Sequence, residues 1–176
     1  MMMARLAFVA AMAIALALPH SSRAAEDAPA CTAPGALTPD LFGWSMLGFR
    51  TAATAPAGLA AAHVSVGEAV LARLAPGASV TYARTPEKPG EPGGFGGMVQ
   101  IAVPRAATYR VVLGTHAWLD LVSARGGAVA SVAHAKGPAC TGIRKMVDFA
   151  LTPGTYTLQI VGSPRADAQV MVIALP

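Results

Sequence analysis

The amino-acid sequence predicts an all-β protein, a β-sandwich or jelly-roll-like fold in a single domain. Beyond residue 60, apolar and polar residues alternate in short runs that are separated by glycine and proline. Val, Thr, Tyr and Ile dominate these runs, as a half-buried pleated surface favours. No stretch after the N-terminal apolar segment has a helical period. Many short strands with regularly spaced turns are typical of sandwiches and jelly rolls.

The expected strands follow one another along the chain after a short helical turn. The tripeptide TPD at residues 38–40 predicts this turn, because threonine can cap a helix and proline suits its first position. Leu41, Phe42 and Trp44 would then pack as an N-terminal plug. The strands are expected at residues 63–66, 69–74, 79–83, 98–103, 108–113, 118–124, 128–133, 145–151, 155–161 and 169–174.

The start of the chain has the anatomy of a secretory signal peptide. Arg5 gives a positive start, residues 6–18 are apolar, and small residues precede a cut after Ala24. The apolar run is too short for a membrane span, which needs about 20 residues. We therefore expect a periplasmic or secreted protein with no membrane span after cleavage. The expected organisation is a signal peptide at 1–24, an N-terminal strip with a short helical turn at 25–60, and a β-sandwich domain at 61–176.

The charge of the exported chain argues against nucleic acid as a partner. Without Arg5 and Arg23, the 13 basic residues fall to 11 against 9 acidic residues, which leaves a net charge of about +2. These charges are scattered, and no basic stripe is interleaved with aromatic residues.

The two cysteines, Cys31 and Cys140, predict one disulfide in an oxidising compartment. It would close a loop of about 110 residues, which the chain-entropy model values at about 4 to 5 kcal/mol. The bond would pin the proline- and alanine-rich strip AEDAPACTAPGALTP to the body of the protein. The alternative is a Cys140 thiolate that acts as a nucleophile or metal ligand beside His134, although this spacing matches no ligand pattern.

Two segments of the chain repeat each other. VQIAVPRAATYRVVLG at residues 99–114 parallels VDFALTPGTYTLQIVG at residues 147–162, with a one-residue offset. Each has an alternating strand, a proline-containing turn, and a second strand after Thr-Tyr. We expect two similar hairpins, with Tyr109 and Tyr156 in equivalent places.

Two of these strand segments resemble bacterial pre-peptidase C-terminal modules, which are small exported β-sandwiches. Such modules commonly show a Gly-Thr-Tyr motif before a late strand and an apolar-Asp-apolar segment before a hairpin. Here the matching residues are GTY at 154–156 and LDL at 119–121, within about a third of the chain. The resemblance implies an accessory or binding unit, although fold alone does not carry function.

The stretches CTAPGALTPDLFGW and GPACTGIRKMVDFALTPG also resemble a group of short exported bacterial proteins, some of which carry the name homogentisate 1,2-dioxygenase. That activity implies a much longer cupin protein with two His and one Glu on a non-haem iron. This chain has no His-x-His followed a few residues later by Glu. The residues therefore do not support the name.

A metal site is the alternative to a binding module. His63, His116 and His134 lie near expected strand ends, so they could meet at one end of a sandwich. With Asp120 or Glu68 they could bind zinc, copper or iron as a divalent cofactor. This alternative would make the protein a non-haem iron dioxygenase-like enzyme or a metal-binding protein.

No sequence motif supplies a catalytic site. The glycine-rich segment 85–97 is expected to be a loop or mobile flap, with Phe95 at its tip as a candidate binding residue. Asp120 is a second candidate binding residue. We therefore expect an exported non-catalytic binding or accessory module of the cell envelope that needs no cofactor. Its partner would be a protein, a glycan or a small-molecule ligand.

Overall fold

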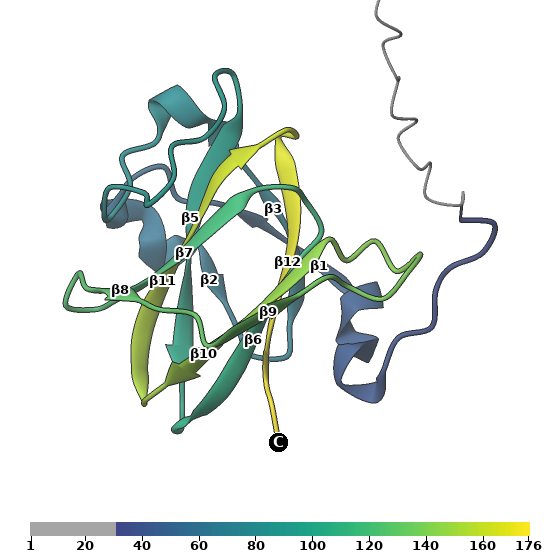
Figure 1. Cartoon of the computed structure of the whole chain (residues 1–176). Coiled ribbons are helices and arrows are strands. Elements are labelled where there is room, and N and C mark those ends of the chain that lie inside the picture. The colour runs from purple at the N-terminus through teal and green to yellow at the C-terminus, as the bar shows by residue number, and fades with distance from the viewer. Residues whose placement is uncertain (1–30) are drawn as a thin grey trace, which may run out of the picture. The chain divides into compact units, whose positions relative to one another are not determined.

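The computed structural model describes residues 31–176, and the predicted signal peptide lies outside them. Two mixed sheets pack together as a β-sandwich, which confirms the predicted fold class (Figure 1). Sheet A contains, in spatial order, β1 (Leu47–Thr51), β3 (Ala69–Arg73), β12 (Asp167–Ala174), β6 (Ala107–Leu113), β10 (Lys145–Leu151) and β9 (Ala133–Ala135). Sheet B contains β2 (His63–Val64), β5 (Phe95–Val103), β11 (Gly154–Ser163), β7 (Trp118–Ser123) and β8 (Ala128–Val129), with β4 (Ala75–Pro76) paired to β5.

Within residues 31–176, three short 3-10 helices connect or cover the strands: η1 (Pro39–Ser45), η2 (Pro56–Ala61) and η3 (Gly77–Ser79). The predicted turn is η1, with Pro39 in its first turn, but the Thr38 side chain makes no capping hydrogen bond. Leu41 and Trp44 are buried as expected. Phe42 is 60% exposed, so it does not belong to the plug.

The main core lies between the two sheets. Fully buried side chains such as Leu113 from sheet A and Leu158 from sheet B pack there. A second apolar cluster combines Leu41 and Trp44 of the η1 segment with residues of sheet A such as Met171. The η1 segment therefore covers apolar side chains of sheet A that are not part of the main core.

Strand β10 shows why alternation predicts these strands well. Phe149 and Leu151 belong to the main core, and Val147 packs against it. Met146, one position out of step, belongs to the second cluster instead. Because successive side chains of a strand point to opposite faces, this period of two identifies residues 145–151 from the sequence.

Some expected strands differ from the structure. Residues 80–83 form no strand, and residues 128–133 divide into β8 of sheet B and β9 of sheet A. Strand β1 was not expected, because its side chains are alternately exposed and half-buried rather than clearly apolar on one face. Sheet A therefore includes a strand from residues 25–60, the segment that was expected to precede the sandwich domain.

The two repeated segments are not hairpins, which corrects that expectation. Strand β5 lies in sheet B and β6 in sheet A, while β10 lies in sheet A and β11 in sheet B. Each repeat therefore crosses from one sheet to the other. The tyrosines do occupy equivalent places: Tyr109 Oη donates to the carbonyl of Arg105 at 3.0 Å, and Tyr156 Oη donates to the carbonyl of Thr152 at 2.9 Å. Each hydroxyl ties a corner between the sheets, as tyrosine corners do in other sandwiches.

Candidate functional site

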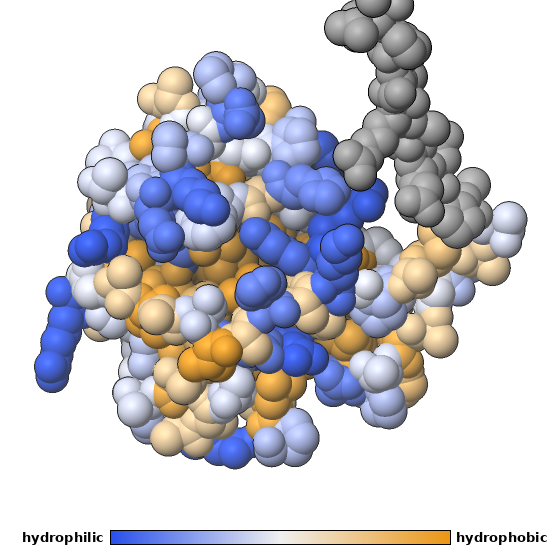
Figure 2. All heavy atoms as spheres, viewed as in Figure 1, coloured by the Kyte–Doolittle hydropathy of each residue, from blue (hydrophilic) through white to orange (hydrophobic). Residues whose placement is uncertain are grey.

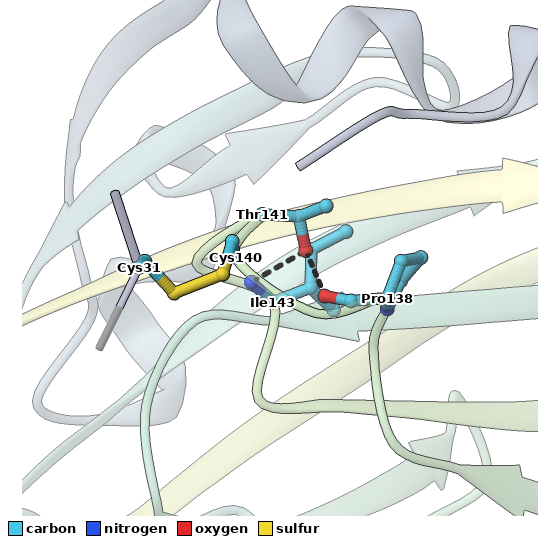
Figure 3. Close-up of a disulfide and its surroundings, with 5 residues drawn as sticks. All are labelled: Cys31, Pro138, Cys140, Thr141 and Ile143. Atoms are coloured by element: carbon cyan, nitrogen blue, oxygen red, sulfur yellow. Dashed lines mark hydrogen bonds between the residues drawn. A yellow bond between two sulfur atoms is a disulfide. The ribbon is translucent and has the colours of Figure 1, made fainter. Parts of the chain in front are cut away.

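Residues 136–144, between β9 and β10, form a loop that carries Cys140 and that we call the cysteine loop. This loop is a structural anchor. Cys31 and Cys140 form the predicted disulfide, with their Cα atoms 5.5 Å apart (Figure 3). Thr141 Oγ1 donates to the Pro138 carbonyl at 2.8 Å and accepts from the Ile143 N–H at 3.3 Å, which shapes the loop. The oxidised Cys140 offers neither a thiolate nucleophile nor a thiolate ligand. The thiol alternative is therefore overturned.

Trp44 also ties the N-terminal strip to the body of the protein, through hydrogen bonds of its indole N–H and its backbone carbonyl. Its Nε1 donates to the Thr141 carbonyl at 3.0 Å, and its own carbonyl accepts from Gln169 Nε2 at 2.6 Å. The indole is 4% exposed. The indole N–H and the backbone carbonyl of Trp44 are thus both occupied by hydrogen bonds within the fold.

The structure does not bring the three histidines together as a ligand group. His63 lies in β2 of sheet B, His116 in the exposed turn before β7, and His134 in β9 of sheet A. Between residues 31 and 176, no three His, Cys, Asp or Glu side chains are grouped so that they could hold a metal ion. Glu68 forms an ion pair with Arg50 at 2.8 Å.

The candidate binding residues Phe95 and Asp120 occupy different surroundings. Phe95 is not at a loop tip: it opens strand β5 and packs against the main core. Asp120 accepts from Trp118 Nε1 at 2.7 Å and from the Glu87 N–H at 3.1 Å. Asp120 therefore holds an aromatic ring and a loop in place at one surface hollow.

This hollow, which we name the Trp118 pocket, lies where β7 and β8 of sheet B meet β9 and β10 of sheet A. Its volume is about 790 Å³, within the usual range of about 300–1,000 Å³ for small-molecule sites. Figure 2 shows apolar surface in this area bordered by hydrophilic side chains. The apolar lining consists mainly of Leu119, Leu121, Val129, Val147 and Phe149.

The rim of the Trp118 pocket holds all three lysines of the chain. Lys88, Lys136 and Lys145 line it, and the sequence has no other lysine. The ammonium of Lys88 lies 4.2 Å from the centroid of the Trp118 ring, and that of Lys145 lies 5.6 Å from it. Both distances are within the range of a cation–π contact, which extends to about 6 Å.

The two ammonium groups over Trp118 form no ion pair with a carboxylate among the described residues. Burial lowers the pKa of Lys145, and repulsion from Lys88 lowers that pKa further, while Asp120 opposes the shift. Within residues 31–176, no ion pair within 4.0 Å includes a lysine. The rim therefore presents positive charge beside apolar walls.

A buried amide fixes the loop that carries Lys88. Gln159, which is fully buried, accepts from the Arg84 N–H at 2.9 Å and donates to the Arg84 carbonyl at 3.0 Å. The bond from the Glu87 N–H to Asp120 fixes the next turn of the same loop. The start of the expected flap is thus tied to sheet B, which keeps Lys88 near Trp118.

The buried acid Asp148 has a structural partner. Arg110 donates to it through Nε and Nη2, each at 2.8 Å. This bidentate contact raises the pKa of Arg110. The carboxylate is therefore occupied by an ion pair and is not a free acid or base.

Two candidates from the sequence, Asp120 and His134, line the Trp118 pocket, whereas Trp118, Lys88 and Lys145 were not among the candidate site residues. These three residues are far apart along the chain, and no motif joins them. The one signal was compositional: three lysines against ten arginines, which marks lysine as a rare residue here.

Comparisons with known proteins leave the chain without an assigned family. No family model matches the chain, and neither a curated protein nor a solved structure matches it. No helix among the described residues is long and apolar enough to cross a membrane. The resemblance to pre-peptidase C-terminal modules stays a prediction.

Proposed function

We propose that the protein is an exported, non-catalytic binding module of the cell envelope that takes up a small molecule in the Trp118 pocket. The single observation that carries the proposal is this pocket of about 790 Å³, with apolar walls and a rim of convergent charged groups. Ligand sites generally combine a mostly apolar lining with a few placed polar groups. The resemblance to accessory sandwich modules and the predicted signal peptide support the same function.

A binding role agrees with how the pocket is built. Trp118 is half-buried, and its indole N–H is fixed by Asp120. Lys145, Val147 and Phe149 come from one strand, and Leu119 and Leu121 come from another, so rigid sheet elements form the walls. A site on rigid strands holds its geometry before the ligand arrives, which lowers the entropic cost of binding.

The test is a ligand screen on the mature protein with the two tryptophan indole N–H signals as NMR reporters. A ligand of the pocket should shift the Trp118 signal and leave Trp44 unchanged, because Trp44 lies under the η1 segment. Native mass spectrometry of protein from the periplasm would detect a ligand that co-purifies. Substitution Trp118→Ala should abolish binding, whereas Phe49→Ala, at a separate hollow of about 450 Å³, should not. Ligands that bind equally to Trp118→Ala would overturn the proposal.

A further inference from the structure

We infer that the ligand of the Trp118 pocket is a small amphipathic anion, with a carboxylate or phosphate head held by Lys88 and Lys145 and an apolar body against the walls. This inference rests on the proposed function and specifies its ligand. Two features of the pocket carry it: the two ammonium groups that contact one indole, and the apolar side chains that line the same pocket.

The head group follows from the charges that face the pocket. Two like charges share one aromatic ring, so each repels the other, and the neighbouring carboxylate of Asp120 already accepts two hydrogen bonds. The other charged or titratable lining residues are Glu87, His134 and Lys136, all of them exposed. An anion placed between Lys88 and Lys145 would relieve their repulsion and form charge-assisted hydrogen bonds, which are about twice as strong as neutral ones.

The body of the ligand follows from the walls. Leu121 and Phe149 are almost completely buried, and Val129 and Val147 are half-buried. An apolar group that covers the half-buried Val129, Val147 and Trp118 removes further apolar surface from water, at about 25 cal/mol per Å². A neutral sugar fits less well, because it would stack on an indole ring that two lysines already contact.

The direct test labels the protein selectively with 13C-lysine, which gives three side-chain signals that report only on this pocket. The probes are octanoate, octanol, octylammonium, glucose and acetate. We expect octanoate to shift the signals of Lys88 and Lys145 and the indole N–H of Trp118, and to bind at least about tenfold more tightly than octanol. Octanoate should also raise the pKa of Lys145, because a bound anion favours the charged ammonium.

Variants separate the head-group contact from general charge. Lys88→Gln and Lys145→Gln should each weaken octanoate binding about tenfold. Lys136→Gln, on the rim but not over the ring, should weaken it less. Arg105→Gln removes an exposed charge at a turn between β5 and β6 and should leave affinity unchanged. Octyl phosphate tested beside octanoate distinguishes a phosphate from a carboxylate head.

The possible failures are distinguishable. Equal binding of octanol, octylammonium or glucose at Trp118 would overturn the anionic class and leave the binding module intact. Acetate as strong as octanoate would show that only free ions pair with the lysines, which overturns the amphiphile. If no probe shifts Trp118, the ligand class is wrong, and the unbiased screen above decides separately whether the pocket binds anything.

Discussion

The two tryptophans of this chain have contrasting surroundings, and the contrast separates structure from site. Trp44 is 4% exposed, and its indole N–H bonds to a backbone carbonyl of the cysteine loop. Trp118 is half-buried, and its N–H bonds to a carboxylate while two ammonium groups lie over its ring. The Trp44 ring, which is buried and hydrogen-bonded within the protein, stabilises the fold. A ring left beside open volume and unpaired charge is available to a ligand.

Removing each ring tests this contrast with the largest expected effect. Trp44→Ala should lower the free energy of unfolding by about 3–5 kcal/mol, because it leaves a cavity between the η1 segment and sheet A. Trp118→Ala should lower it by about 1 kcal/mol or less, since it removes a half-exposed ring and its cation–π contacts. Chemical denaturation measures both. Equal losses would mean that Trp118 is a core residue and that the contrast is wrong.

The disulfide should contribute the next largest effect. Cys31→Ser should cost about 2–5 kcal/mol, because the bond joins residues 109 positions apart and restricts the unfolded chain. Cys140 has a φ of 62°, a left-handed backbone that glycine adopts without strain. Cys140→Gly should therefore cost about 1 kcal/mol less than Cys31→Ser. The Trp118 pocket should keep its lysine signals in both variants. A pocket that collapses would show that the two regions are coupled.

Two buried or half-buried glutamine amides allow a smaller, paired comparison. Gln169 holds the Trp44 carbonyl, and Gln159 holds the backbone of Arg84 before Lys88. Each change to leucine should cost about 1–3 kcal/mol, because backbone groups lose their partners. Only Gln159→Leu should release the Lys88 loop and weaken octanoate binding. Thermal unfolding and the 13C-lysine spectrum measure the two effects, and an unchanged Lys88 signal in Gln159→Leu would contradict the role of that amide.

The sequence predicts those parts of the fold that depend on local alternation. Strand β10 agrees residue for residue with the expected 145–151, because its core-facing side chains are apolar at every second position. The repeated Tyr109 and Tyr156 were also correctly equated. Alternation does not show to which sheet a strand belongs, so it predicts two hairpins, although each repeat crosses between the sheets.

The site was less predictable, for a physical reason. Histidine and cysteine attract attention because of their chemistry, yet here Cys140 is oxidised, and His63 lies in β2 at a ladder position opposite β5. The residues that meet at the pocket, Lys88, Trp118 and Lys145, are brought together by a loop and by strands of two different sheets. Their proximity is a tertiary fact, and no spacing in the sequence encodes it.

The smallest expected effect is on the pKa of Lys145, and it is the most specific to the pocket. Burial and Lys88 lower this pKa, while Asp120 raises it. Lys88→Gln should therefore raise it, and Asp120→Asn should lower it further. Because the folded protein binds this proton less tightly than the unfolded chain, the contribution of Lys145 to stability should increase as the pH rises from below its lowered pKa towards 10.5.

A pH titration of the 13C signal of Lys145 measures these shifts directly, with Arg105→Gln as the matched control variant. The pKa of Lys145 should be unchanged in Arg105→Gln, because the exposed Arg105 does not line the pocket. Deprotonation of Lys145 removes one of the two positive charges over Trp118, so octanoate affinity should fall as Lys145 titrates. If octanoate affinity stays unchanged while Lys145 titrates, the head group lies away from Lys145, and Trp118 contacts only the apolar body of the ligand.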